Sequence, residues 1–167
     1  MKNKYIWICV SFFFLIYSFF VLFCNPVLST LHSEYPEKIS SKEKIELREM
    51  ILNFKNNINE EILKKCHISV DSRLKPVVDI QFNELSKAIN ACHTGGVSHP
   101  ENFGYIILNG VYENMAFNIE IKFAKVSGTK TAYLTICALD ENGDELYGIP
   151  FISKELTDWA WKVKVFE

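Results

Sequence analysis

The pattern of apolar and polar positions changes twice along the chain. An uncharged, mainly apolar run extends from Tyr5 to Cys24. From about Ser41, apolar residues recur every three or four positions, and from Phe103 onward apolar and polar residues mainly alternate. A period of three to four is typical of amphipathic helices, and a period of two is typical of half-buried strands. The pattern therefore predicts a hydrophobic N-terminal segment, then helices, then strands.

The N-terminal run has the length and composition of a membrane span. Lys2 and Lys4 precede it, and the run itself carries no charge. As a helix it would span about 30 Å, the thickness of a bilayer's hydrocarbon core. Because basic flanks stay in the cytoplasm, we expect residues 1–4 to be a cytoplasmic flank and residues 5–24 a transmembrane signal-anchor. The chain would then be a single-pass membrane protein with an extracytoplasmic C-terminal domain.

Two alternatives to an anchor remain open at this point. Residues 1–29 could be a signal peptide, because Val27 and Ser29 suit the positions three and one before a cut. Cleavage near Ser29 would release a secreted or periplasmic protein. The apolar run is longer than the usual signal core of about 7–15 residues, which favours the anchor. A lipoprotein cut before Cys24 would need a small residue where Phe23 stands.

Residues 25–39 are rich in turn-forming and polar residues and predict a tether to a single domain over residues 40–167. Ser40 lies three positions before Glu43, the spacing of a helix capping box. A helix is predicted from Ser41 to Cys66, on a stripe formed by Leu47, Ile51, Phe54, Ile58 and Ile62.

A second helix is predicted from Pro76 to His93, with its first part also compatible with a short strand. Gly95 and Gly96 are expected to end it.

Five strands are predicted after Phe103. They involve Tyr105 and Ile107, then residues 117–123, 131–139, 145–152 and 159–165. Turn signals separate them, namely Ser-Gly-Thr at residues 127–129 and an Asn-Gly pair within residues 140–144. Residues 131–139 are apolar on both faces and should be central, whereas Pro150 marks its strand as an edge or a bulge.

Helices followed by consecutive strands predict an α+β domain, with one or two helices packed on a four- to five-stranded antiparallel meander. This outline is similar to the cystatin-like and NTF2-like folds. The similarity is one of element order alone, and fold does not determine function.

Composition narrows the class of partner. The chain of 167 residues has a formal charge of −2 from 18 basic and 20 acidic residues. Without Lys2 and Lys4, 16 basic residues face the same 20 acidic ones. Such a balance argues against nucleic-acid binding and supplies no polybasic patch for anionic lipid.

Cysteine chemistry leaves one question open. Cys66 and Cys92 would each end a helix on the same sheet face, so a disulfide between them and a pair of packed free thiols are both expected alternatives. Cys137 is expected to be a buried thiol. His67 and His93 directly follow two of these cysteines, but zinc ligands are usually separated by two to four residues. We therefore expect no metal and no cofactor.

No catalytic signature is present, and the sequence leans towards a protein without enzymatic activity. The acidic residues 140–145 do not match a calcium loop, and Trp159 and Trp161 are expected to be core residues. If the domain does hold a small-molecule pocket between helix and sheet, Tyr105, Tyr133 and His99 are the candidates for lining it.

Two functions follow from these expectations. The first is a non-catalytic domain, membrane-tethered or exported, that binds another protein in the cell envelope as a machine subunit or as an inhibitor or immunity-type protein. An exposed sheet edge would accept a strand from that partner. The second is a small-molecule-binding domain or a hydrolase- or isomerase-type enzyme.

Overall fold

A computed structural model describes residues 39–74 and 80–166, which belong to one compact unit, Ile39–Glu167. The predicted cytoplasmic flank, the membrane span over residues 5–24, the signal peptide over residues 1–29 and nearly all of the tether lie outside the described residues. Within the two described ranges, no helix combines the length and apolar character needed to span a membrane.

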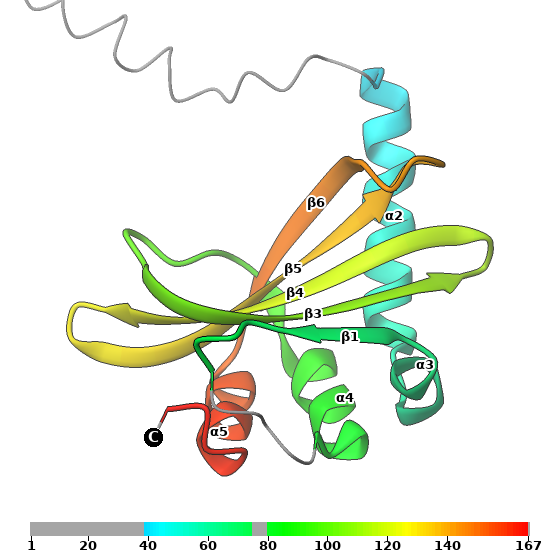
Figure 1. The fold of residues 1–167 in the computed structure, drawn as a ribbon. Coiled ribbons are helices and arrows are strands. Elements are labelled where there is room, and N and C mark those ends of the chain that lie inside the picture. Colours follow the sequence, from blue (N-terminus) through cyan, green and yellow to red (C-terminus); the bar gives the residue numbers. More distant parts are fainter. Residues whose placement is uncertain (1–38, 75–79, 167) are drawn as a thin grey trace, which may run out of the picture. The chain divides into compact units, whose positions relative to one another are not determined.

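The domain is α+β, as predicted, and its sheet has six antiparallel strands in the order β1-β3-β4-β5-β6-β2 (Figure 1). The four long strands form the predicted meander: β3 (Glu101–Tyr112), β4 (Met115–Val126), β5 (Thr129–Leu139) and β6 (Glu145–Ile152). Two short strands, β1 (His67–Val70) and β2 (His93–Thr94), add to its two edges. Both edge strands precede the meander in sequence, and neither was predicted.

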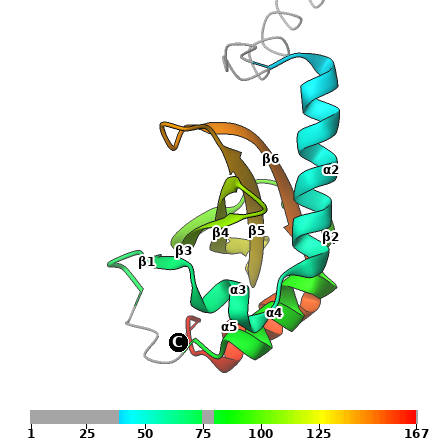
Figure 2. The same cartoon turned by 90° about the vertical axis from the view of Figure 1, so that its right-hand side faces the viewer.

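The helices α2 (Ser41–Asn57), α3 (Glu60–Lys64), α4 (Phe82–Ala91) and α5 (Lys154–Lys162) lie to one side of this sheet (Figure 2). The strict alternation in β4 explains this arrangement, because Phe117, Ile119 and Ile121 point to one face and are at most 1% exposed. Phe54 of α2 packs on that face, with its ring centroid 4.1 Å from that of Phe117 and 5.1 Å from that of Tyr112. The core therefore lies between the helices and a single face of the sheet.

The long first helix is interrupted, which corrects the prediction of one helix from Ser41 to Cys66. Its predicted capping box is confirmed, because the Ser40 hydroxyl accepts from the backbone N–H of Glu43 and the Glu43 carboxylate accepts from that of Ser40. However, Ile58 leaves the helical conformation with ψ 126°. Asn59 then caps the short helix α3 by accepting from the N–H of Ile62 at 3.1 Å. A new cap inside the apolar stripe thus ends α2 where periodicity alone would continue it.

The second helix is shorter than the predicted range from Pro76 to His93. It begins at Phe82 and ends at Ala91, and Cys92 is already extended. His93 belongs to β2, which pairs with the end of β6. The glycines at 95 and 96 therefore do not end this helix. Residues 75–79, which include Pro76, lie outside the described residues.

The last predicted strand is a helix. Ser153 caps α5 by accepting from the N–H of Leu156 at 3.1 Å. Trp159 is 3% exposed and belongs to the core, as expected, but Trp161 is 48% exposed. The alternation of apolar residues from 159 to 165 fits a strand, yet Leu156, Trp159 and Ala160 are also spaced three and four apart. Because a cap precedes them, the helical period prevails.

Both predicted hairpin turns are confirmed. Ser127 and Gly128 join β4 to β5 with φ values of 49° and 86°. Gly143 joins β5 to β6 with φ 85°, and the Asp140 carboxylate accepts from the N–H groups of Asn142 and Asp144. Positive φ at both sites is the conformation that glycine adopts without steric cost.

Candidate functional site

One face of the sheet is covered by none of the described helices, and its polar side chains form cross-strand rows. We call the following residues the helix-free face: Tyr105, Ile107, Asn109, Asn118, Glu120, Lys122, Tyr133, Thr135 and Cys137. The register places Tyr105 opposite Lys122 and Lys122 opposite Tyr133. The next rows are Ile107–Glu120–Thr135 and Asn109–Asn118–Cys137. Side chains directly opposite one another in antiparallel strands have Cβ atoms only about 4.5–5.5 Å apart, so each row is a set of neighbours.

Lys122 is the cation at the centre of this face. Its ammonium lies 2.7 Å from the Glu120 carboxylate, and the two side chains are 30% and 25% exposed. Partial burial alone would lower the pKa of Lys122, but the hydrogen bond and negative charge of Glu120 outweigh it and raise that pKa. Lys122 is therefore an ammonium at neutral pH, and it cannot serve as a general base there.

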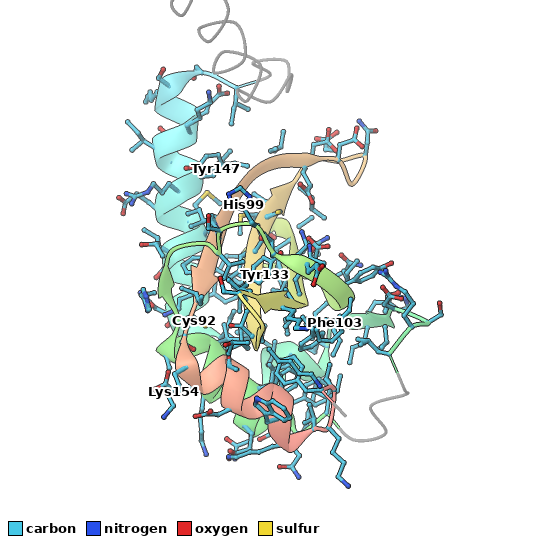
Figure 3. All side chains as sticks on the ribbon, turned by 90° about the vertical axis from the view of Figure 1, so that its left-hand side faces the viewer. Cys92, His99, Phe103, Tyr133, Tyr147 and Lys154 are labelled. Atoms are coloured by element: carbon cyan, nitrogen blue, oxygen red, sulfur yellow. The ribbon has the colours of Figure 1, made fainter. Side chains whose placement is uncertain are left out.

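Two of the three pocket candidates lie on this face. Tyr105 and Tyr133 flank Lys122, and the Tyr133 hydroxyl donates to the Asn102 side chain at 2.9 Å. His99 lies on the segment of residues 95–100 that connects β2 to β3, and it is exposed with φ 49° (Figure 3).

The sequence suggested a small-molecule pocket lined by tyrosine and histidine between the helices and the sheet, but this side of the sheet is apolar. It is packed with apolar side chains that are at most 1% exposed, among them Phe54, Phe117, Ile119, Leu134 and Ile136. Tyr105 and Tyr133 point to the opposite face. We expected these two tyrosines between the helices and the sheet, but in the structure they lie on the helix-free face.

Cys137 is buried as predicted, with 3% exposure. Burial raises its pKa to about 12, and the carboxylates of Glu145 and Glu120 add to this effect. The thiol stays protonated at neutral pH, and only the thiolate is a good nucleophile. Cys137 is therefore a packing residue. Beside it, Asn118 has a buried side-chain oxygen that accepts no hydrogen bond within the described part of the chain.

Gly148 of β6 lies opposite Cys137, whose side chain fills the space that a larger residue at position 148 would need. A Cβ atom at position 148 would lie 2.8 Å from the Cys137 sulfur, closer than packed atoms approach. We expect Gly148→Ala to lower the free energy of unfolding by about 1–3 kcal/mol, the usual cost of overpacking. Urea unfolding of residues 39–167 measures this. In a protein that already carries Cys137→Ala, Gly148→Ala should cost much less, and an equal cost of Gly148→Ala with and without Cys137→Ala would contradict the explanation.

Cys66 and Cys92 are free thiols in the structure. The Cys66 thiol donates to the carbonyl of Ile62, and the Cys92 thiol contacts the Ala88 carbonyl and the Ser153 hydroxyl. Cys66 directly precedes β1 and Cys92 directly precedes β2, which occupy opposite edges of the sheet. Burial raises the pKa of both thiols. Of the two alternatives left open by the sequence, this geometry matches packed free thiols.

The described ranges contain no group of three or more His, Cys, Asp or Glu residues arranged to hold a metal ion. Asp140 and its acidic neighbours form the tip of the β5–β6 hairpin, where the Asp140 carboxylate binds backbone N–H groups. This matches the expectation of a solvated hairpin tip at this position.

The outer strand β1 provides a second kind of surface. Within residues 39–74 and 80–166, its residues pair with β3 on one side only, and three of its four residues are exposed. The N–H of Asp71, just after the strand, donates to the carbonyl of Tyr105 on β3 at 3.0 Å. Because backbone groups alternate in direction along an antiparallel strand, those of Ile68 and Val70 point away from β3. This outward row of N–H and C=O groups is called the free edge of β1 below.

The strand β1 was not predicted because its sequence signal is short. Ile68 and Val70 do alternate with His67 and Ser69, but the pattern covers four residues only and follows directly on a helical stripe.

Comparison with known proteins adds no constraint on function, because no protein-family model, no curated protein and no solved structure matches this chain.

Proposed function

We propose that this chain is a non-catalytic domain, tethered to a membrane or exported, that binds another protein in the cell envelope by accepting an extended segment at the free edge of β1. The observation that carries the proposal is the outward row of backbone groups on Ile68 and Val70. A strand added there would satisfy these groups, and pairing of this kind is a common way to recognise a peptide segment.

Side chains on β1 support the same reading. Val70 is 36% exposed and is one of the few large apolar side chains on the surface of the described residues. Edge strands are often protected by an inward-pointing charge or by proline, and β1 has neither within His67–Val70. Among the strands that the structure describes, none pairs with this outer edge.

The membrane part of the proposal rests on the sequence. Residues 5–24 would serve as the span, or residues 1–29 as a signal peptide removed near Ser29, and both segments lie outside the described residues. The likeness of element order to cystatin-like and NTF2-like folds stays a prediction and carries no part of this proposal.

A proline substitution on the free edge tests the proposal. Val70→Pro removes one outward N–H without removing a bond to β3, and proline is tolerated on edge strands. Val70→Thr is the matched control, because it keeps the N–H and a β-branched side chain. The tagged full-length chain and both variants would be purified in mild detergent from the cells in which the protein occurs.

We expect one partner polypeptide to co-purify with the parent chain and with Val70→Thr. With Val70→Pro its recovery should fall by up to about tenfold, because one lost main-chain hydrogen bond contributes about 0.5–1.5 kcal/mol and about 1.4 kcal/mol corresponds to a factor of ten. Repeated recovery of the tagged chain with no second polypeptide, neither another protein nor an untagged copy of the chain, would count against protein binding. A partner retained equally by Val70→Pro would count against the edge as its site.

A second candidate is favoured by the row in which Lys122 lies between Tyr105 and Tyr133. Together with Glu120 and Thr135, these groups could hold a small polar ligand on the helix-free face, which would be the alternative of a small-molecule-binding domain. Replacing Lys122 by methionine should abolish such binding and leave the association at β1 unchanged. Isothermal titration with candidate ligands would separate the two activities.

A further inference from the structure

The free edge of β1 has two-fold self-complementarity. When a second copy of the strand runs antiparallel with its Ser69 opposite Ser69, Ile68 of one copy lies opposite Val70 of the other. Both of these residues direct their N–H and C=O groups outward. Each Ile68–Val70 pair can therefore exchange two main-chain hydrogen bonds, in the pattern of a hydrogen-bonded antiparallel pair.

The side chains of the same register also match. On the side of the sheet that the helices cover, the exposed Val70 would lie beside Ile68 of the second copy, so that an apolar contact replaces contact with water. On the other side, the exposed His67 would lie opposite Asp71 of the second copy, whose buried carboxylate is already bound by Arg73 of its own chain, so this row adds no ion pair. Two serines would meet at the two-fold axis, where small side chains allow the strands to approach.

From this register we infer that the segment added at β1 is β1 of a second copy of this chain, so that two domains join their sheets across a two-fold axis. The inference rests on the proposed function, because it names the partner for the same edge. An interface formed by the same patch on both copies closes after two subunits, and it would leave no free edge at β1.

The interface between the two β1 strands is small. Four residues per copy bury far less than the roughly 1,000 Å² expected of a stable independent interface. Association would therefore depend on the high effective concentration that a shared membrane provides, so the full-length chain in its membrane is the sample of choice.

Cysteine cross-linking at the two-fold axis tests the inference. In this register, residue 69 forms a non-hydrogen-bonded pair, with Cα atoms about 4.5 Å apart, which lies within the range that a disulfide spans. We expect Ser69→Cys to form a covalent dimer on mild oxidation, seen on a non-reducing gel. The parent chain, with its native cysteines, gives the background.

Two variants make the outcome specific. His67→Cys lies on the same strand and the same face, but its counterpart in the second copy would be four residues away along the strand, about 13 Å. It should cross-link at least about tenfold less than Ser69→Cys. Adding Val70→Pro to Ser69→Cys should return the dimer to the background, whereas adding Val70→Thr should not.

The outcomes separate this inference from the proposed function. If Ser69→Cys cross-links no better than His67→Cys, while a different protein co-purifies in a manner sensitive to Val70→Pro, the second copy is excluded and the edge remains a protein-binding site. If neither cross-linking nor co-purification occurs, the inference and the proposed function both fall. Cross-linking that survives Val70→Pro would overturn the proposed register.

Discussion

Replacing Phe54 by alanine is expected to lower the free energy of unfolding of this domain by about 3–5 kcal/mol. Phe54 is 0% exposed, and its ring joins α2 to the sheet through contacts with Phe117 of β4 and Tyr112 of β3. Alanine would leave a cavity between two elements that are distant in sequence, so the surrounding side chains can close it only in part. Such a loss is a large fraction of the stability of a typical domain.

Urea unfolding of residues 39–167 followed by far-ultraviolet circular dichroism measures this loss. Phe54→Leu is the matched control, because it keeps most of the apolar volume and should cost clearly less. Glu49→Ala lies on an exposed position of the same helix and should change the stability by less than about 0.5 kcal/mol. A change below about 1 kcal/mol for Phe54→Ala would show that α2 does not pack on the sheet in this way.

The second large effect is expected at the C-terminal end, where Phe166→Ala should also cost about 3–5 kcal/mol. Residues that lie outside a helix or strand usually contribute little unless packing holds them in place. Here Phe166 is 2% exposed, with its ring centroid 4.9 Å from that of Trp161 and 5.9 Å from those of Phe103 and Phe123. Lys130 of β5 also donates to the Phe166 carbonyl.

The same unfolding measurement tests the C-terminal prediction, and Phe166→Leu serves as its control. Hydrogen exchange adds a readout that separates local from global effects. If the last turn merely frays, Phe166→Ala will speed exchange in α5 alone and leave the urea midpoint unchanged. A shifted midpoint would show that this side chain supports the whole core.

The sequence predicted most of the meander, because its signals are local. Alternation in Phe117–Phe123 marks one strand, and the glycines at 128 and 143 adopt the positive φ values that their turns require. These elements need only a strand period and turn chemistry to be recognised. The α+β class then follows from the order of elements.

The predicted elements that differ from the structure lie where several local signals compete, or where a strand pairs with a partner far away in sequence. Asn59 interrupts a continuous apolar stripe with a new cap, and Ser153 starts a helix in a segment that also alternates. The short strands β1 and β2 exist only because β3 and β6 offer them partners far away in sequence. No local pattern of two to four residues can predict such pairing.

The residues of the candidate site were predicted only in part. Tyr105 and Tyr133 were recognised as polar aromatic groups, but the face to which they point depends on register and on which side the helices cover. Lys122 joins them only through that register. The free edge of β1 could not be predicted at all, because an edge is defined by the final position of a strand in the sheet.

The placement of β1 and β2 at the two outer positions of the sheet has a consequence for biosynthesis. Both strands leave the ribosome before any part of β3–β6, yet each pairs only with a strand of that later block. About the first sixty residues of the compact unit must therefore wait, with their apolar side chains uncovered, until the meander has been made. During that interval the nascent segment exposes the kind of apolar surface that chaperones bind.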